Sequence, residues 1–394
     1  MIKSIVNLPA IFIIIMFVFH GCSKDVLPEG PTRASDRPPL KIGVILPVTG
    51  PYESIARNHL AAINAAARNT PGIAGRNVII TAKDSKGDYS TAIEAVRQLE
   101  KERAAGIILI AYGDEATELS RSYCPDARKK KQTRLQMQIP VIVINAPDFA
   151  SRTCSGIWRL SPSSSELIRA SLHFIKSTMN SNRIAVILNS EEDGGIRFAT
   201  MFLKEFTNSG GTIVDIYDIN EKGSKEKLLQ LKRKKPSLIL IPDANRKTSE
   251  TVKLLRSDNI KAPVFFIHSP EDKDVFETLR KIPEIYLINH FSFQPTKNER
   301  CKRLLEVFSE DNIAPETGAF ISGDALFLLI DAAVLPQNTT SDMIPLFSVT
   351  GNETYLTGKI GLMEDGSVKK TLYIIKLKGS DTELIEEVNL IYQD

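Results

Sequence analysis

The sequence has little cysteine and none of the motifs that mark common catalytic or metal sites. Only four of its 394 residues are cysteine, and no two of them form a Cys-x-x-Cys pair. Cysteines scattered in this way, without histidine partners, do not make a zinc site. A Gly-x-Ser-x-Gly elbow, a His-Glu-x-x-His pair and a phosphate-binding loop are also missing from the sequence. We therefore expect no metal site, no cofactor and no enzymatic activity.

One set of residues imitates a catalytic triad, namely His268, Ser269 and Asp243. All three follow predicted strands, so they fall where a sheet places its loops. Because the other signals of an enzyme are absent, we interpret them as loop residues and not as a nucleophile with its base.

The chain also lacks a strong charge of one sign. Its formal net charge is +3, which gives no signal for nucleic-acid binding. Hydrophobic residues make up 42% of the sequence and charged residues 25%, so we expect a globular fold with disorder confined to the ends. A length of 394 residues suits two domains of ordinary size better than one core.

The N-terminal apolar run is too short to span a membrane. It covers residues 11–19 after the positive Lys3, whereas a spanning helix needs about 20 apolar residues. Residues 1–22 are therefore predicted to be a signal peptide. Gly21 and Cys22 resemble the end of a bacterial lipobox, in which the cysteine is diacylated, although the two preceding residues depart from the usual pattern. An ordinary secretory signal and an uncleaved anchor are the alternatives.

The segment 23–39 is rich in proline and polar residues and has too little apolar surface to fold. We expect it to be a tether between the lipid on Cys22 and the folded domains. In an oxidising compartment, Cys124 and Cys154 are the expected disulfide pair, because they follow neighbouring strands of one β-α unit. Cys301 would stay outside this disulfide.

Short β-branched runs alternate with amphipathic helical patterns through most of the chain. Such unbroken apolar strands are typical of parallel sheets that are buried on both faces. The alternation predicts two doubly wound α/β lobes, with a change from one to the other at about residue 161. The predicted strands cover residues 40–46, 78–82, 107–110 and 141–144 in the first run, and 184–188, 212–217, 238–241, 264–267 and 285–288 in the second.

The last hundred residues do not form a third domain. They contain one apolar helix over residues 318–334 and a hairpin over residues 355–377, which cannot bury themselves alone. They must return to the two lobes, which makes both lobes discontinuous. The sequence therefore predicts lobe 1 over residues 40–161 plus 291–345, and lobe 2 over residues 162–290 plus 346–394.

Five motifs follow one another along the chain, at residues 42–52, 84–88, 157–162, 183–194 and 358–366. Their order resembles that of the type 1 periplasmic binding proteins of branched-chain amino acid ABC transporters. The resemblance implies two parallel-sheet lobes joined by a three-strand hinge, with a ligand between them. It also implies an extracytoplasmic protein that binds a small solute and delivers it to an ABC permease.

The ligand loops depart from the amino-acid-binding pattern of that family. The loop over residues 111–115 carries two acids where small hydroxyl residues usually meet the ligand carboxylate. The loop 191–194 is acidic as well, and residues 243–245 replace the usual tyrosines. A ligand carboxylate in a closed site would be repelled by these acids. We therefore expect a cationic or neutral hydrogen-bonding ligand; the alternative is that the acids cap helices and face solvent.

Ligands of open α/β sheets lie beyond the carboxyl ends of the strands, close to helix N-termini. Each residue at such a position also has a simpler interpretation as a solvated loop end or a helix cap. The candidate ligand-binding residues are Tyr52, Tyr112, Gly113, Asp114, Asn145, Ala146, Asp193, Asp243, Asn245, Ser269 and Phe291.

Two lysine-rich runs have ordinary interpretations. Residues 232–235 close a predicted helix, where cations suit the helix dipole. Residues 129–131 lie in an insertion that we expect to be solvated, with contact to an anionic surface as the alternative.

Two functions remain open at this point. One is a solute receptor of an ABC transporter, held by lipid on the extracytoplasmic side of a bacterial membrane. The other is an envelope lipoprotein of the same fold that binds a protein partner, as the activators of penicillin-binding proteins do.

Overall fold

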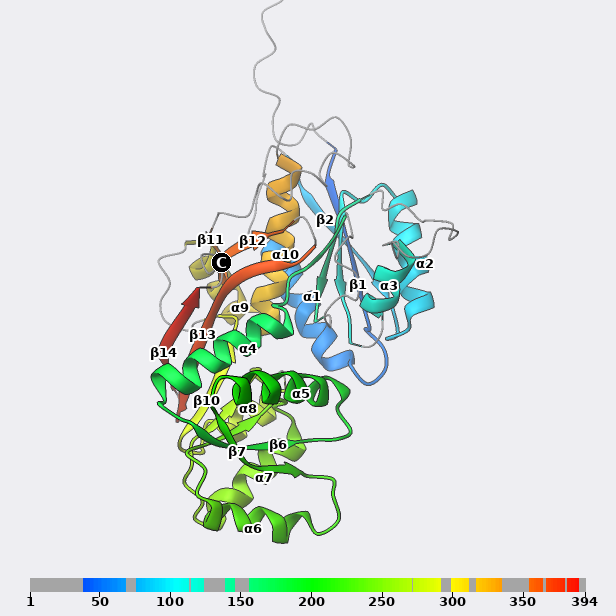
Figure 1. Ribbon diagram of the computed structural model, residues 1–394. Coiled ribbons are helices and arrows are strands. Elements are labelled where there is room, and N and C mark those ends of the chain that lie inside the picture. Colours follow the sequence, from blue (N-terminus) through cyan, green and yellow to red (C-terminus); the bar gives the residue numbers. More distant parts are fainter. Residues whose placement is uncertain are drawn as a thin grey trace, which may run out of the picture.

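The computed structural model describes residues 38–68, 76–112, 115–123, 139–145, 156–270, 272–291, 299–311, 317–334, 354–363, 366–379 and 381–389. The predicted signal peptide, the tether up to residue 37, Cys22, Cys124 and Cys154 lie outside these residues. Within them, the chain forms two α/β lobes, shown one above the other in Figure 1. In the described part of the chain, no helix is both long and apolar enough to cross a membrane.

Lobe 1 is built on a five-stranded parallel sheet in the order β2-β1-β3-β4-β5. The strands β3 and β4 are fully buried, and β1 is buried except at Lys41, as the sequence predicted for a sheet covered on both faces. The strands are β1 (Leu40–Leu46), β2 (Val78–Asp84), β3 (Gly106–Ile110), β4 (Val141–Ile144) and β5 (Ile157–Arg159).

Helices cover both faces of the lobe 1 sheet. On one face, α1 (Glu53–Arg68), α9 (Glu299–Glu310) and α10 (Thr317–Val334) pack over the side chains of Ile42 and Val44. On the other face, α2 (Tyr89–Lys101) and α3 (Glu115–Tyr123) share a second apolar core with the sheet. The last two helices on the first face come from far along the chain, so lobe 1 is discontinuous.

Lobe 2 repeats this plan with the order β7-β6-β8-β9-β10, all parallel. One face carries α4 (Ser164–His173), the π-helical turn Phe174–Thr178 and α5 (Asp193–Asn208), and the other carries α6 (Ser224–Lys234), α7 (Arg246–Ser257) and α8 (Lys273–Leu279). The strands are β6 (Arg183–Leu188), β7 (Thr212–Asp218), β8 (Leu238–Ile241), β9 (Val264–Phe266) and β10 (Ile285–Asn289).

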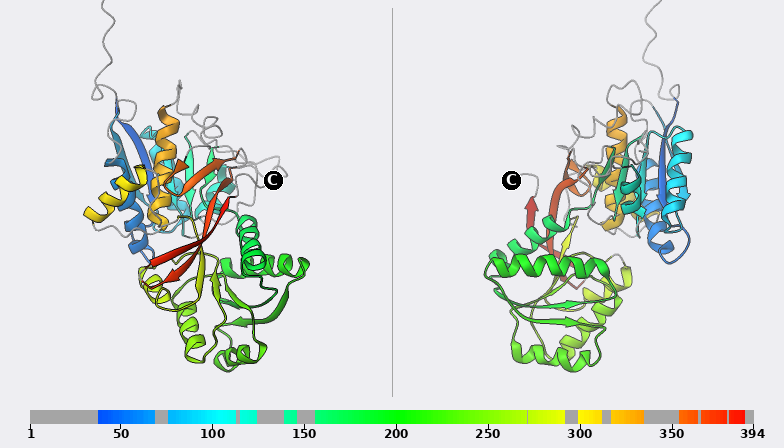
Figure 2. Two further views of the ribbon diagram at one scale, coloured as in Figure 1. Left: turned by 90° about the vertical axis from the view of Figure 1, so that its left-hand side faces the viewer. Right: turned by 45° about the vertical axis from the view of Figure 1, so that its right-hand side comes forward.

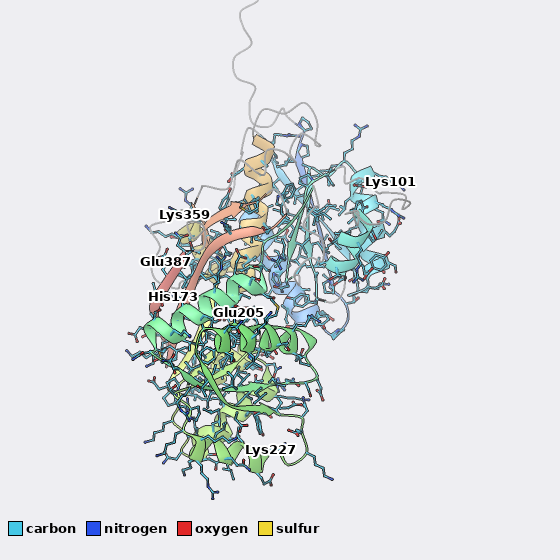
Figure 3. All side chains as sticks on the ribbon, viewed as in Figure 1. Lys101, His173, Glu205, Lys227, Lys359 and Glu387 are labelled. Atoms are coloured by element: carbon cyan, nitrogen blue, oxygen red, sulfur yellow. The ribbon has the colours of Figure 1, made fainter. Side chains whose placement is uncertain are left out.

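Charged side chains surround these cores. Lys101 in lobe 1 and Glu205 and Lys227 in lobe 2 are exposed and project from their helices (Figure 3). The two doubly wound sheets, with apolar interiors and charged surfaces, confirm the fold class that the sequence predicted.

The C-terminal strands join the two lobes. β13 (Val368–Lys378) pairs antiparallel with β10 in lobe 2 and with β12 (Gly358–Leu362), and β14 (Asp381–Asn389) pairs with β13. Val368, at the start of β13, is buried in the lobe 1 core, whereas Leu372 is buried in the lobe 2 core. β13 therefore crosses from one lobe to the other, as Figure 2 shows.

The chain crosses between the lobes at two further places. Leu160 belongs to the lobe 1 core and Leu167 to the lobe 2 core, so the segment after β5 is one crossing. Phe291 lies in the lobe 1 core directly after β10 of lobe 2, which makes the other. These two segments and β13 together form the three-strand hinge that the family resemblance implied.

The packing differs from the predicted division of the chain at its C-terminal end. The predicted lobe 2 included all of residues 346–394, but Tyr355, Leu356, Ile360 and Leu362 are buried in the lobe 1 core. The reason is that β11 (Thr354–Tyr355) and β12 lie against α10, and only the later part of β13 and β14 reach lobe 2. The strand β14 was not foreseen from the sequence.

Candidate functional site

The carboxyl ends of the lobe 1 strands point toward lobe 2 (Figure 1). β1 begins at the far end of lobe 1 and ends on the side nearest lobe 2, and its parallel neighbours end at the same edge. In lobe 2, α5 follows the carboxyl end of β6 and lies on the side facing lobe 1. The residues that follow these strand ends are the candidates for ligand contacts.

Asp84, at the end of β2, fixes the loop after β1. Its carboxylate accepts hydrogen bonds from the Thr49 hydroxyl at 2.6 Å and from the backbone nitrogens of Val48 at 3.1 Å and Lys86 at 2.9 Å. Partial burial opposes ionisation, but these hydrogen bonds outweigh it and lower the pKa of Asp84. The acid is thus ionised and engaged in holding the loop that leads to Tyr52.

Glu115 does the same for the loop after β3. It is fully buried at the start of α3, and its two carboxylate oxygens accept from Ser85 Oγ at 2.7 Å and from the Tyr112 backbone nitrogen at 2.9 Å. One of the two acids that the sequence placed in the loop 111–115 therefore ties loops together. The other acid, Asp114, lies outside the described residues, as does Gly113.

Two tyrosines lie side by side at this edge of lobe 1. The rings of Tyr52 and Tyr112 are stacked, with centroids 4.8 Å apart and planes inclined by 17°. The Tyr112 hydroxyl lies 2.9 Å from Nε2 of His59 on α1, and His59 Nδ1 lies 2.7 Å from Ser322 Oγ on α10. Burial lowers the pKa of His59 to about 4, so the ring is neutral at pH 7. The sequence analysis named both tyrosines but did not pair them.

Asp243 is the main polar group at the edge of lobe 2. It follows β8, and its Oδ2 atom is buried with no hydrogen-bond partner among the described residues. The carboxylate lies against Gly195 in the first turn of α5, where an added Cβ would be 1.8 Å from Oδ2. Burial, with a smaller contribution from the negative charge of Glu192, raises the pKa of Asp243 to about 6. Within the described part of the chain, Oδ2 of this carboxylate therefore has no donor.

The other candidate residues after the lobe 2 strands differ in their hydrogen bonding and exposure. Asn245 caps α7, because its Oδ1 accepts from the Thr248 backbone nitrogen at 3.0 Å. Ser269 is partly exposed after β9. Asp193 opens α5, but its side chain is not among those described. The alternative interpretation of a helix cap thus applies to Asn245.

Three candidates remain, and the two that are described, Asn145 and Phe291, belong to lobe 1. Asn145 follows β4 with a positive φ of 58°, a conformation that asparagine tolerates in tight turns. Ala146, next to it, is outside the described residues. Phe291 is only 2% exposed and stacks on Phe320 at 4.0 Å, so its ring is part of the core and not of the strand edge.

The sequence analysis missed three residues that hold the lobe 1 edge together, namely His59, Ser85 and Ser322. A signal for His59 is present, because it falls among Ala56, Ala62 and Ala66 on the buried face of α1. A polar residue on an apolar helix face needs a partner. The sequence does not reveal which partner, since Ser322 is 263 residues away.

A second polar cluster is buried where β12 and β13 pack on α10. Lys370 and Asp324 are fully buried, and Lys370 Nζ lies 2.8 Å from Thr357 Oγ1. Asp324 accepts from the backbone nitrogens of Leu356 at 2.6 Å and Thr357 at 3.0 Å. Burial lowers the pKa of Lys370 to about 8 and raises the pKa of Asp324 to about 6. These groups hold the hinge strand β13 against lobe 1.

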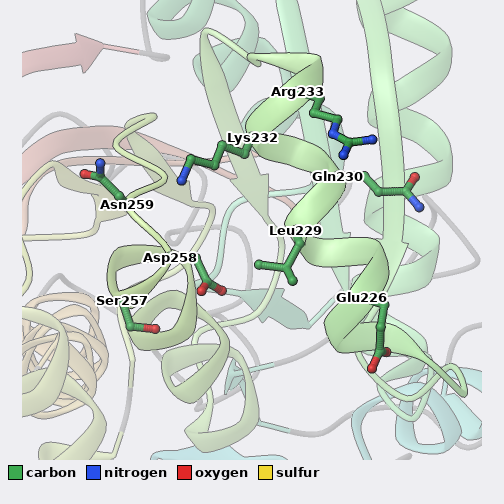
Figure 4. Close-up of a pocket in the computed structure, with 8 residues that line it drawn as sticks. All are labelled: Glu226, Leu229, Gln230, Lys232, Arg233, Ser257, Asp258 and Asn259. Carbon is green, nitrogen blue, oxygen red and sulfur yellow. The ribbon is translucent and has the colours of Figure 1, made fainter.

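A hollow on lobe 2 lies away from the strand edges. It is formed by α6 and the C-terminal end of α7, with Leu229 between charged and polar side chains (Figure 4). The segment after α7 leads to the amino end of β9, so this hollow is on the side opposite to Asp243. We do not assign the ligand to it. Its lining residues are Glu226, Leu229, Gln230, Lys232, Arg233, Ser257, Asp258 and Asn259.

The cysteine predictions concern residues that are mostly not described. Cys22, Cys124 and Cys154 lie outside the described residues, so the lipid anchor and the disulfide stay predictions. Cys301 is buried in the lobe 1 core and takes part in no disulfide within the described part of the chain. In the same described part, no cluster of histidine, cysteine or acidic residues could hold a metal ion.

Solved structures of binding proteins share this fold. A leucine-binding protein from Thermotoga maritima superimposes with a TM-score of 0.69 at 18% identity, covering 89% of this chain and 99% of that one. A branched-chain amino acid binding protein from Streptococcus pneumoniae, in complex with isoleucine, gives 0.70 at 17% identity over 89% and 99% of the two chains. A solute-binding protein of an ABC transporter from R. palustris, in complex with benzoate, gives 0.67 at 16% identity over 90% and 98%.

The sequence comparisons agree with the fold. A search of curated proteins gave no match to this chain. The family model described as "Periplasmic binding protein", however, matches residues 39–377, which is nearly all of the chain outside the predicted signal peptide and tether. Together with the two-lobed structure, this match confirms the resemblance seen in the sequence: the chain belongs to the periplasmic binding protein family.

Proposed function

We propose that this protein is an extracytoplasmic solute receptor that closes its two lobes on a small polar ligand and delivers it to an ABC permease, without catalysing a reaction. The observation that carries the proposal is the Asp243 carboxylate at the carboxyl edge of the lobe 2 strands, whose Oδ2 atom is buried and has no hydrogen-bond partner among the described residues. A buried polar atom without a hydrogen bond is unfavourable, so such an atom at a sheet edge is typical of a site that is completed by a ligand.

The same observation supports a ligand that donates hydrogen bonds or carries positive charge. Asp243 needs a donor or a cation, and Glu192 adds a further negative charge nearby. A ligand amine, amide or hydroxyl group would supply the missing donor, whereas a simple carboxylate would add repulsion. We therefore infer that a cationic or neutral hydrogen-bonding solute is preferred to leucine-like amino acids or benzoate.

The cellular setting is the second part of the proposal. The signal peptide and the Gly21-Cys22 pair support a lipid anchor that holds the receptor on the extracytoplasmic side of a bacterial membrane. An anchored receptor stays close to its permease, which suits delivery of a solute captured outside the cytoplasm.

A thermal-shift screen with purified protein tests the function and the ligand class together. The panel contains amines, amides, polyols, amino acids and aromatic acids, because any solute that binds only the folded state raises the melting temperature. We expect a shift with a cation or a neutral donor, and we expect Asp243→Asn to abolish it. Asp381→Asn, an exposed acid at the start of β14, is the matched control and should bind normally.

The screen distinguishes a wrong ligand class from a wrong function. Shifts with leucine or benzoate that survive Asp243→Asn would contradict the ligand class but leave the solute receptor in place. If no solute of any class shifts the melting temperature, the receptor proposal is wrong. Isolation of the protein from membranes in a complex with another envelope protein would then favour a protein-interaction module.

A further inference from the structure

His59 and the two tyrosines at the edge of lobe 1 form one connected unit. The imidazole joins Tyr112, which follows β3, to Ser322 on α10, and it does so from a position on α1 that is only 2% exposed. These three elements come from distant parts of the chain. The ring therefore fixes the position of Tyr112 relative to the whole of lobe 1.

The neighbouring backbone leaves space for this ring. A Cβ added to Gly318 would lie 2.6 Å from Cε1 of His59, so a larger residue in the first turn of α10 would collide with the imidazole. A neutral imidazole has one donor and one acceptor nitrogen. The hydroxyls of Tyr112 and Ser322 therefore take opposite roles, one donating to the ring and the other accepting from it.

Tyr112 is held at both ends. Its backbone nitrogen donates to Glu115 at 2.9 Å, and its hydroxyl is bound to His59 at 2.9 Å. The ring between these two points stacks on Tyr52, which directly precedes α1. Both rings are only partly buried, so the pair presents an aromatic surface at the carboxyl edge of the lobe 1 strands.

We propose that the Tyr52–Tyr112 pair is the lobe 1 platform for a small organic cation, and that His59 is the positioning residue that holds this platform in its stacked orientation. The inference rests on the proposed function, because it names the ligand class of the same site.

The chemistry of the two lobes supports a cation. The face of an aromatic ring is the negative end of its quadrupole and attracts a cation within about 6 Å of its centre. On the other lobe, Asp243 has a buried carboxylate oxygen that lacks a donor among the described residues. An ammonium group would interact favourably with both surfaces, whereas a carboxylate would be repelled by both.

The test is a double-mutant cycle on the full chain, with binding measured by calorimetry. The probes are choline and phenethylamine as cations, and phenylacetate and leucine as controls with a carboxylate. We expect the wild type to bind at least one cation and neither control. Tyr52→Leu removes one ring of the platform and should weaken cation binding about tenfold or more.

His59 acts through the Tyr112 hydroxyl, and the cycle tests this directly. His59→Leu and Tyr112→Phe should each weaken cation binding several-fold, and the double variant should be no weaker than the weaker single one, because both changes remove the same hydrogen bond. His59→Gln places an amide near the tyrosine hydroxyl and should recover most of the affinity. His173→Leu, an exposed histidine on α4, is the matched control.

The outcomes separate this inference from the proposed function. Losses that multiply in the double variant, or a Tyr112→Phe variant that binds like the wild type, would show that His59 does not act through Tyr112. Binding of leucine or phenylacetate in place of the cations would contradict the platform while leaving a solute receptor. If no solute of any charge binds, both fail. Should His59→Leu not fold, Tyr112→Phe alone decides, since it keeps the ring.

Discussion

The Asp243 carboxylate rests directly on Gly195, which lies in the first turn of α5. A Cβ at residue 195 would be 1.8 Å from Asp243 Oδ2, far closer than two non-bonded atoms can approach. A Cβ added to the preceding residue, Gly194, would have no other atom within 4 Å. The position of the Asp243 carboxylate therefore requires a glycine at residue 195, whereas residue 194 has room for a side chain.

Gly195→Ala should displace Asp243 and weaken ligand binding, whereas Gly194→Ala should not. The added methyl group forces the carboxylate away from α5, and overpacking of this kind costs about 1–3 kcal/mol of stability. Thermal melts and ligand titrations of both variants provide the measurement. Equal behaviour of the two variants would show that the position of Asp243 is irrelevant to the site.

Binding of a cation should depend on pH through Asp243. Burial raises its pKa to about 6, so below that pH the carboxyl group is protonated and loses its attraction for a positive charge. Affinity for a cation should therefore be full above pH 7 and fall as the pH drops through 6. Calorimetry between pH 5 and pH 8 checks this, with Asp243→Asn as the variant that should be weak and independent of pH.

His59 should make the folded protein less stable in mild acid. Its pKa falls from the ordinary value of 6.5 to about 4 on burial, so the unfolded chain binds a proton between these values and the folded chain does not. The stability is thus present above pH 6.5 and lost as the pH falls toward 4, by an amount on the order of 3 kcal/mol. Denaturant titrations of the wild type and His59→Gln should show a smaller loss in the variant. Parallel pH curves for the two proteins would refute the assignment.

Lys370→Met should destabilise the protein strongly, because Asp324 would lose the nearby buried cation. Removing one of two opposite buried charges that interact costs about 3–5 kcal/mol. Lys369→Met, its partly buried neighbour on β13, is the matched control and should change stability little. Chemical denaturation measures both. In the double variant Asp324→Asn, Lys370→Met, we expect part of the loss to be recovered, since no uncompensated charge remains.

The lipid anchor rests on Cys22 after the short apolar run. Metabolic labelling of the producing bacteria with a palmitate analogue should mark the wild type and leave Cys22→Ser unmarked. Cys301→Ser serves as the control and should be labelled normally, because this cysteine is buried in lobe 1. Equal labelling of the wild type and Cys22→Ser would rule out the predicted lipoprotein.

The sequence by itself determined the two-lobed fold. Runs such as Val141–Ile144 and Leu238–Ile241 contain only β-branched and aliphatic residues, and each is fully buried in its sheet. Local composition and periodicity suffice for such strands, because a strand covered on both faces has to be apolar throughout. The order of the motifs along the chain then indicated the family. The sequence also placed Tyr52, Tyr112 and Asp243 at strand ends, since parallel strands bring their following loops to one edge.

Only the tertiary structure decided which of these side chains act together. Glu115 ties two loops, Asn245 caps a helix and Phe291 is buried in a core, while Oδ2 of Asp243 lacks a hydrogen-bond partner among the described residues. The sequence treats all of them alike, as polar or aromatic residues in loops. Tyr112 is linked through His59 to Ser322, and His59 and Ser322 are 263 residues apart in the sequence. Hydrophobic periodicity reports on the surroundings of one element at a time, so a contact between distant elements is fixed only when the lobes close around their cores.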